Sequence, residues 1–434
     1  MVHEMRKNKF KNIKVALIAP SNEFLSDPLM SEPLGLMYIE GVLRELDVEV
    51  EMVDMSFVDK LPQADIYGFS ASTVHFPQVL EFSKQVKGAY TIIGGPHTSA
   101  LPEEVKKFFN AVVVGPGEKA ILRILEDFIR DKKGGIFKEP VNNINLIPIS
   151  PRTIMNKHKY TVFPGTSVSA SLLTSRGCPY KCSFCASNVI WGRKVLFYSV
   201  DRVVREIEYL KNEFNIRHFK FIDDIFTLNK SRFREFSKIL SGLDIKWICE
   251  TRIDSLDDEI LDQLLRGGCN FVDLGIESVD DFVLEKIQKQ QNSAKAKASI
   301  AKIKSRGLKV KIYIIYGLPF EPKDIVQKTI DFIKETNPDY VSLFTLVPYP
   351  GTDIWNNPKK YNIKKIYNDF NVYQHSVGGI KEELSWLPVI EYNDRSREKM
   401  REERNVLKKY TMEWNKKNLS TSDTGSANTE KLIC

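Results

Sequence analysis

Long hydrophobic runs are missing from this 434-residue sequence. No stretch of about 18 apolar residues occurs, so we expect no membrane span. The apolar run from Ile13 to Pro20 follows a charged start, but polar residues end it at once. It therefore lacks the length and the flanks of a secretory signal peptide. These absences favour a cytoplasmic protein, in a compartment where cysteine thiols stay reduced.

An excess of charge of one sign is also missing. The sequence has 63 Lys and Arg against 56 Asp and Glu, a net charge of +7 that is spread along the chain. Such a small excess is typical of a mixed, solvated surface rather than of a nucleic-acid interface. The densest basic stretches, Lys286 to Lys304 and Lys359 to Lys365, are expected to be exposed helix faces or loops.

Cysteine is rare, with six in the whole chain and none before Cys178. Three of them form a C-x3-C-x2-C run: Cys178, Cys182 and Cys185. A structural zinc site usually needs a second pair of ligands, and the remaining cysteines (Cys249, Cys269 and Cys434) are isolated from one another. Three thiols within eight residues also pair poorly as disulfides. A [4Fe-4S] cluster fits better, because three thiolates leave one iron open for a small molecule.

Residues 13–131 alternate short apolar runs with amphipathic helical stretches. Strands are expected at 13–18, 48–53, 66–70, 90–93 and 111–114. Strands that alternate with helices predict an α/β fold, here a doubly wound, Rossmann-like parallel sheet. Ligands bind at the carboxyl ends of such strands, where this sequence has loops of small residues at 68–73, 94–98 and 115–118. No G-x-G-x-x-G follows the first strand, so a dinucleotide site is not expected.

The rest of the chain divides into four parts. After a first domain at 1–139, residues 140–168 form a linker rich in Pro and Asn. From 169 to 355 strand and helix alternate six times, with strands at 170–174, 218–222, 246–250, 271–276, 310–316 and 340–346. Six such units predict a partial (βα)6 barrel with its active site at the strand carboxyl ends. Residues 356–417 are irregular and then helical, with no strand pattern, and the polar tail 418–434 is expected to be disordered.

The cysteine run follows the first barrel strand and has an aromatic residue, Phe184, before its last cysteine. In this it resembles the radical S-adenosylmethionine (SAM) superfamily. The resemblance implies that Cys178, Cys182 and Cys185 hold a [4Fe-4S] cluster whose open iron chelates SAM. It also implies that the reduced cluster cleaves SAM to a 5′-deoxyadenosyl radical, while the protein positions the cofactor.

Further motifs at successive barrel strand ends support this resemblance. The SAM-binding residues that it implies are Phe184, Asp223, Asp224, Glu250, Arg252, Glu277, Ser278 and Gly317. Simpler roles compete with some of these. One aspartate of the pair would suit a helix N-cap, Glu250 and Arg252 would suit an ion pair on one strand face, and Phe184 would suit packing beside the cluster. Cys249 is expected to be a buried core thiol rather than a fourth ligand.

The first 139 residues resemble the cobalamin-binding domain that precedes the radical SAM domain in one large subfamily. Three segments carry the resemblance: 33–36 (PLGL), 94–97 (GGPH) and 114–118 (VGPGE). It implies a set of cobalamin-binding residues, namely Ser70, Thr73, Gly94, Gly95, His97, Gly115, Gly117 and Glu118. The D-x-H-x-x-G motif is missing, so no histidine from that motif would lie beneath the cobalt. The alternative is a sheet that is retained without its cofactor.

Together the two resemblances imply a cobalamin-dependent radical SAM enzyme that methylates an unactivated carbon of a small molecule or natural product. A flavodoxin or ferredoxin would supply electrons. Two alternatives stay open at this point: cyclisation, rearrangement or oxidation with or without bound cobalamin, and a non-catalytic iron–sulfur protein. A methylthiotransferase fits less well, because that family carries three cysteines in its N-terminal domain and this chain has none before Cys178.

Overall fold

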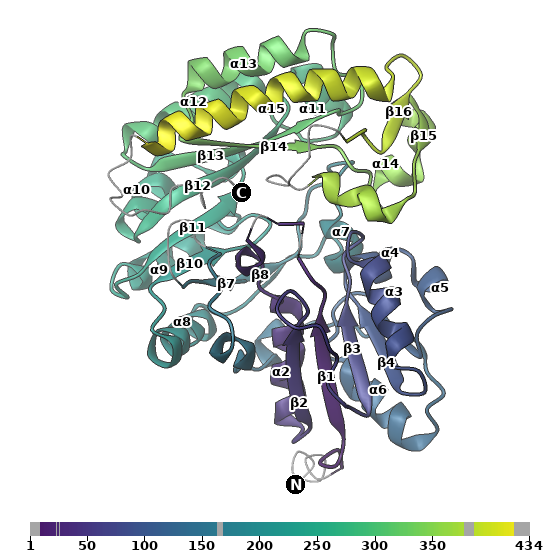
Figure 1. Ribbon diagram of the computed structural model, residues 1–434. Helices are drawn as coiled ribbons and strands as arrows, with labels where there is room; N and C mark the ends of the chain where they lie inside the picture. Colours follow the sequence, from purple (N-terminus) through teal and green to yellow (C-terminus); the bar gives the residue numbers. More distant parts are fainter. Residues whose placement is uncertain (1–8, 23, 26, 163–167, 377–385, 421–434) are drawn as a thin grey trace.

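A computed structural model describes residues 9–420 of the protein, except 23, 26, 163–167 and 377–385. Its described part contains two six-stranded parallel sheets and two small two-stranded sheets. The first large sheet, from the N-terminal part of the chain, lies in the lower half of Figure 1, and the second lies in the upper half. The predicted α/β class with two sheet domains is confirmed.

The first sheet has the strand order β2-β1-β3-β4-β5-β6. Its strands are β1 (Lys14–Ala19), β2 (Glu49–Asp54), β3 (Ile66–Ser70), β4 (Tyr90–Gly94), β5 (Ala111–Val113) and β6 (Gly135–Phe137). The helices between them are α2 (Leu34–Glu45), α3 (Phe76–Gln85), α4 (Pro96–Ala100), α5 (Pro102–Val105) and α6 (Ala120–Arg130). The sequence did not predict β6, a three-residue strand that begins with glycine. The strand order reverses between β1 and β3, which is where ligands bind in doubly wound sheets.

The second sheet has the order β14-β13-β12-β11-β10-β7 and forms the expected six βα units. Its strands are β7 (Ala170–Leu172), β10 (His218–Phe221), β11 (Lys246–Thr251), β12 (Cys269–Glu277), β13 (Lys309–Tyr316) and β14 (Tyr340–Thr345). The helices that follow are α8 (Val200–Phe214), α9 (Lys230–Leu240), α10 (Asp258–Arg266), α11 (Asp281–Lys286), α12 (Ser293–Ser305) and α13 (Ile325–Thr336). All six strands lie where the sequence predicted them, within a few residues.

Side-chain caps fix where several barrel helices begin. Ser199, Asn229, Asp257 and Asn292 each accept a hydrogen bond from the backbone N–H three residues further on. Such caps satisfy N–H groups that have no partner within the helix. The helices cover one face of the barrel sheet, which buries Phe221, Trp247 and Val272 against them. Within the part of the chain that the structure describes, no helical layer covers the other face of the sheet (Figure 1).

A short antiparallel pair, β8 (Ser175–Arg176) and β9 (Leu196–Phe197), frames the cysteine run, and α7 (Ser187–Trp191) lies between them. The loops at the carboxyl ends of β4 and β5 contact this segment: α4 packs on α7, and Gly115 lies against the Ile190 carbonyl. Because β8 and α7 follow the carboxyl end of β7, the carboxyl ends of the two sheets meet.

The segment 140–168, predicted as a linker, is partly packed into the core. Arg152 is fully buried and donates hydrogen bonds of 2.9 Å to Glu206 of α8 and to the Ser171 carbonyl of β7. Its Nη1 atom also lies 3.6 Å from Glu32 of the first domain. The segment therefore ties the two sheets together. The exact domain limits 139, 168 and 355 stay predictions.

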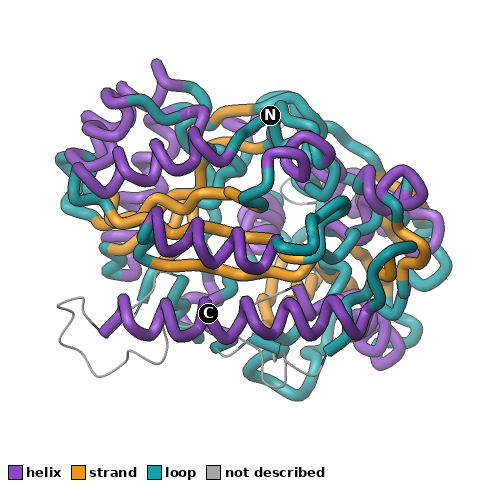
Figure 2. Tube along the Cα trace, turned by 90° about the horizontal axis from the view of Figure 1, so that it is seen from above, coloured by secondary structure: helices purple, strands orange, loops and turns teal. Residues whose placement is uncertain are grey.

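The region after the barrel contains α14 (Asp353–Asn356), β15 (Ile363–Ile366), β16 (Ile390–Tyr392) and the long helix α15 (Arg397–Ser420). The expectation that no strand lies here is wrong, since β15 and β16 pair as an antiparallel hairpin. Their partners are more than 20 residues apart, so local sequence gives little sign of the pairing. The α15 helix packs along β14 and α13 (Figures 1 and 2). Most of the predicted disordered tail, from 421 to 434, lies outside the described residues.

Candidate active site where the two sheets meet

The three clustered cysteines lie in the loop after β8. All three are free thiols and partly exposed. A backbone hydrogen bond ties the loop to the end of α11: the Ser183 N–H donates to the Ile287 carbonyl at 2.9 Å. Among the described residues, no three His, Cys, Asp or Glu side chains converge to hold a single metal ion. Three thiols in one loop suit a [4Fe-4S] cluster, in which each thiolate binds a different iron.

Burial in this loop raises the pKa of each thiol. The pKa of Cys185 rises to about 12, and those of Cys178 and Cys182 rise in the same direction. Because metal ligation needs thiolates, bound iron must supply the positive charge that stabilises them. The negative charge of Asp224 contributes to the raised pKa of both Cys178 and Cys185, which places this carboxylate beside the loop.

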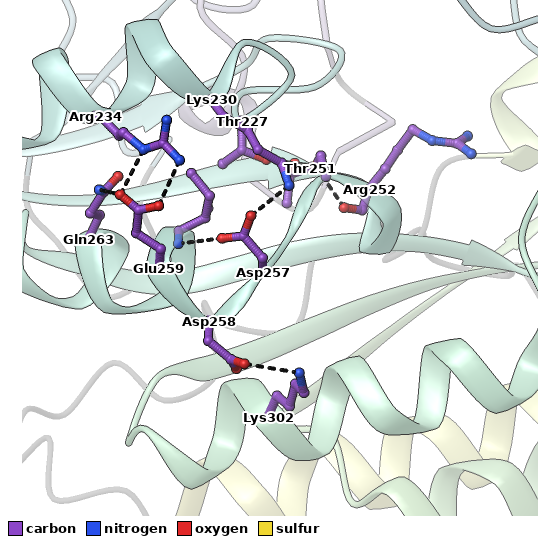
Figure 3. Close-up of polar contacts among 12 residues, drawn as sticks. Thr227, Lys230, Arg234, Thr251, Arg252, Asp257, Asp258, Glu259, Gln263 and Lys302 are labelled. Atoms are coloured by element: carbon purple, nitrogen blue, oxygen red, sulfur yellow. Dashed lines mark hydrogen bonds and ion pairs between the residues drawn. The ribbon is translucent and has the colours of Figure 1, made fainter.

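Arg252, at the end of β11, contacts the cysteine loop directly. Its guanidinium lies 3.6 Å from the centre of the Tyr180 ring, and its Nη1 lies 3.9 Å from the Cys182 sulfur. Two further nitrogens donate to the Asp254 carboxylate at 2.9 and 3.1 Å. The Arg252 side chain points away from the surface ion pairs of α9 and α10, such as Arg234–Glu259 (Figure 3). The grip of Arg252 on the SAM carboxylate stays a prediction. The contact of Glu250 with SAM also stays a prediction, and Glu250 pairs with Lys220 at 3.0 Å rather than with Arg252.

Lys289 lies beside the cysteine loop, although its sequence context did not predict this. The stretch from Lys286 to Lys304 was expected to be an exposed face, but Lys289 is only 5% exposed, so for this residue the expectation is wrong. Its ammonium lies 2.8 Å from Glu277 and its charge acts on Cys182. Glu277 adopts a left-handed backbone (φ 65°) that turns its side chain back over Gly275. A side chain at Gly275 would collide with this ion pair, which explains the glycine at this position.

The two adjacent aspartates after β10 have different surroundings. Asp223 is fully buried and accepts hydrogen bonds from the Thr174 N–H, the Thr174 hydroxyl and the Ser175 hydroxyl. Its carboxylate therefore joins β10 to the strand that leads into the cysteine loop. Asp224 is exposed and faces that loop. Both stay predicted SAM residues, and the contacts favour Asp224 for direct binding.

The remaining predicted SAM residues line or support the same strand ends. Gly317 has a positive φ (86°), its N–H donates to Glu321 and its carbonyl accepts from the Tyr392 hydroxyl. The Ser278 hydroxyl accepts from the Asp280 N–H. Phe184 is partly buried and packs against the core beside the cysteines. Cys249 is fully buried on the helix-covered side, in agreement with its expected role as a core thiol.

A cavity of about 190 Å³ opens at the carboxyl end of the first sheet, where its strand order reverses. Of the predicted cobalamin residues Ser70 lines it, together with Gly35, Glu32 and His75. Glu32 Oε1 is buried without a hydrogen-bond partner among the described residues. An unpaired acceptor suits the amide N–H groups around a corrin ring. Burial lowers the pKa of His75 to about 4, so this unforeseen histidine is neutral.

Other predicted cobalamin residues are packed inside the domain. His97 is fully buried, with its ring 4.1 Å from that of Phe76 and 5.0 Å from that of Phe370. Its Nδ1 lies 3.3 Å from the Thr73 hydroxyl. Gly94 ends β4, and Gly95 has a positive φ (105°) and leaves no room for a side chain, since a Cβ would lie 2.7 Å from the Ala71 carbonyl. These residues shape the loop next to the cavity, and their contact with cobalamin stays a prediction.

The last predicted cobalamin loop contacts the cysteine loop. Gly115 and Gly117 bring Glu118 against Arg176, with an Nη1–Oε1 distance of 2.6 Å. The Arg176 guanidinium also lies over the rings of Tyr38, Trp191 and Tyr198. Burial alone would lower the pKa of Arg176, but Glu118 raises it. Glu118 therefore serves the junction of the two domains, and contact with cobalamin remains a prediction.

Comparison with known proteins agrees with this geometry. The Radical SAM superfamily model matches residues 172–333, and the B12 binding domain model matches residues 28–125. An uncharacterized methyltransferase of Pyrococcus horikoshii is 30% identical over 383 residues, which are 80% of this chain and 83% of that protein. The chain belongs to the radical SAM enzymes with a B12-binding domain. Its cofactors are accordingly a [4Fe-4S] cluster, SAM and cobalamin.

One further relative and one solved structure are similar to this enzyme over most of its length. The bacteriochlorophyllide d C-12(1)-methyltransferase of Chlorobaculum tepidum is 22% identical over 367 residues, covering 82% of this chain and 79% of that one. The radical SAM methyltransferase TsrM of Kitasatospora setae, solved with cobalamin and a [4Fe-4S] cluster, shares the fold with a TM-score of 0.63. It is 17% identical and the match covers 79% of this chain and 73% of TsrM. Within the described residues, no helix of this enzyme is long and apolar enough to cross a membrane.

Proposed function

We propose that this enzyme methylates an unactivated carbon of a small molecule. The observation that carries the proposal is the meeting of the two sheets at their carboxyl ends, fixed by the buried Arg176–Glu118 ion pair. A reaction that needs radical formation and methyl delivery on one substrate requires both cofactor sites at one place. Two relatives are named as methyltransferases, which supports methyl transfer over cyclisation, rearrangement or oxidation.

When bound, the reduced cluster supplies the electron that cleaves SAM, and cobalamin supplies the methyl group. The overall reaction converts R–H, two SAM molecules and two electrons into R–CH3, methionine, 5′-deoxyadenosine and S-adenosylhomocysteine. The hydrogen atom of the substrate leaves in 5′-deoxyadenosine, and the methyl group comes from the SAM that becomes S-adenosylhomocysteine.

The chain's own residues have distinct parts in this proposal. Cys178, Cys182 and Cys185 hold the cluster, and Asp224 binds the SAM ammonium beside it. Arg252 and Lys289 place positive charge next to Cys182, which favours its thiolate form. We also propose that a flavodoxin or ferredoxin delivers the electrons and that the enzyme works in the cytoplasm. The free state of the five cysteines in the described residues suits a reducing compartment.

Anaerobic turnover of SAM tests this function. Holoenzyme purified with cobalamin and mixed with a chemical reductant and SAM should form 5′-deoxyadenosine, and S-adenosylhomocysteine should form with it when cobalamin is bound. Formation of 5′-deoxyadenosine alone, in enzyme shown to contain cobalt, would instead favour a radical rearrangement or oxidation. Absence of both products in enzyme that contains iron would reject radical SAM catalysis.

A further inference from the structure

The barrel sheet has an open, charged face. Along β13 the side chains alternate strictly between partly exposed and fully buried, and β10 shows the same alternation. The buried set packs against the helices, so the partly exposed set lines the opposite face, inside the barrel. Barrel interiors are normally filled by packed apolar side chains. Partly exposed side chains on β10 and β13 leave this interior less tightly filled, as a ligand site requires.

Four adjacent strands contribute charged or polar groups to this interior. Lys220 of β10 lies 3.0 Å from Glu250 of β11, and their side chains are 23% and 36% exposed. Asp273 of β12 accepts a hydrogen bond of 2.8 Å from the Tyr313 hydroxyl of β13. Glu250 and Asp273 are paired in register across β11 and β12, and Asp273 and Lys311 are paired across β12 and β13, so these side chains form one cluster. We call Lys220, Glu250, Asp273, Lys311 and Tyr313 the interior cluster.

One acceptor of the interior cluster is unused. Asp273 is 2% exposed, and its Oδ1 atom has no hydrogen-bond partner among the described residues. A buried carboxylate oxygen without a donor is unfavourable, and such atoms in native proteins commonly have a ligand or solvent partner. The Lys220 ammonium has three N–H groups and a contact with Glu250, so it is able to donate to a second acceptor.

The interior cluster adjoins the SAM site, and aromatic rings flank it. Glu250 lies near the end of β11, two residues before Arg252, and the Arg252 Nη1 atom lies 3.9 Å from the Cys182 sulfur. The rings of Tyr313 and Phe344 lie 5.8 Å apart on neighbouring strands of the same face. A molecule in the barrel interior would thus contact the polar groups of the interior cluster and the aromatic rings of Tyr313 and Phe344. It would lie next to the SAM site at the carboxyl ends of the strands.

We propose that the interior cluster binds the methyl acceptor, and that this substrate is a small ionisable molecule with a hydroxyl or ammonium donor for Asp273 and an acceptor for Lys220. This inference rests on the proposed methyltransferase function and narrows it. A neutral hydrocarbon lipid would leave Asp273 unpaired and Lys220 partly desolvated, so the site would reject it. A site built to hydrogen-bond a substrate group discriminates strongly against analogues that lack the group.

Transfer of a labelled methyl group tests the proposal. Holoenzyme is incubated anaerobically with reductant, SAM carrying a trideuterated methyl group and a metabolite extract of the source organism. Mass spectrometry then locates the label in the aqueous, ion-exchange-retained fraction or in the neutral organic fraction. The variants are Asp273→Asn and Lys220→Gln, with Lys246→Gln at the far, exposed end of β11 as the matched control. Iron content, cobalt content and the unfolding temperature verify that each variant is intact.

The expected result is a labelled ionisable product. Its yield should fall at least about tenfold in both cluster variants and stay unchanged in Lys246→Gln. Label in a neutral lipid would overturn this inference while it upholds methyl transfer. An ionisable product that forms equally well in Asp273→Asn and Lys220→Gln would also overturn it. No labelled product from wild-type enzyme that cleaves SAM would reject the methyltransferase function and this inference together.

Discussion

The Arg176 guanidinium lies 2.6 Å from the Glu118 carboxylate, and with 3% and 8% exposure both side chains are buried. Arg176 opens the cysteine loop, and Glu118 ends a loop of the B12-binding domain. One ion pair thus joins the two cofactor domains next to the cluster ligands. Removal of one partner from such a pair leaves a buried charge without compensation.

The Glu118→Gln substitution should therefore lower the free energy of unfolding by about 3 kcal/mol. The matched control is Glu259→Gln, which breaks the pair with Arg234 at 2.7 Å, where the side chains are 52% and 45% exposed (Figure 3). Exposed pairs contribute less than about 1 kcal/mol. Denaturant unfolding of both variants measures the difference. Equal losses in the two variants would show that the Arg176–Glu118 pair does not hold the domains together.

Substitution of a cluster-ligand cysteine should remove iron and activity, whereas substitution of a core cysteine should not. Cys182→Ala should lose at least about nine-tenths of the bound iron and all SAM cleavage, because a cluster held by two thiolates is labile. Cys249→Ala is the control, since Cys249 is fully buried on the helix-covered side of β11. Iron analysis and the 5′-deoxyadenosine yield report the outcome. Retained iron in Cys182→Ala, or lost iron in Cys249→Ala, would assign the ligands differently.

Substitution of the two adjacent aspartates should affect different properties, namely stability for Asp223 and SAM affinity for Asp224. Asp223→Ala leaves the Thr174 N–H and two buried hydroxyls without an acceptor, so it should lower stability by about 3 kcal/mol or more. Asp224→Ala should keep stability and weaken SAM binding at least about tenfold, since its carboxylate is exposed beside the cysteines. Unfolding curves and equilibrium SAM binding distinguish the two. Unchanged SAM affinity in Asp224→Ala would remove this residue from the site.

Glu321 predicts a pH dependence of stability. Burial raises the pKa of this carboxyl to about 7 despite Arg395 at 3.0 Å. The folded state therefore favours the protonated form, and this stabilisation is present below the unfolded pKa of about 4.5 and is lost as pH rises through 7. Between pH 5 and pH 8 the free energy of unfolding of the wild type should fall by about 3 kcal/mol relative to that of Glu321→Gln. Unfolding temperatures of the two proteins across this range measure it, and parallel curves would contradict it.

The sequence was sufficient for most of the fold. The strands of the barrel, such as Val310 to Tyr316, are apolar or alternating runs bounded by turn residues, so local pattern predicts them. The β15–β16 hairpin escaped prediction because its pairing joins distant segments through short, charged strands. The short strand β6 escaped because three residues beginning with glycine carry no pattern.

The candidate site was predictable where a motif supplied it and unpredictable where chain folding did. Cys178 to Cys185 form one contiguous motif, so their grouping required no tertiary information. Lys289 lies in a basic stretch that is typical of a solvated surface, and only the position of its loop beneath Cys182 buries it. The partnership of Glu118 with Arg176 joins two domains, and no local pattern pairs an acid with a base so far along the chain.

The most direct test of the two-cofactor account is the cobalt and iron content of enzyme purified anaerobically from cells supplied with cobalamin. The account predicts about four irons and one cobalt per chain. Gly35 lines the cavity of the first sheet, and a Cβ there meets no atom within 4 Å, so the site accepts a side chain at its base. The test variant is Gly35→Trp, and its unfolding temperature verifies that it folds. That variant should keep its iron and lose cobalt, whereas Gly35→Ala should keep both. Iron without cobalt in the wild-type enzyme would contradict the account.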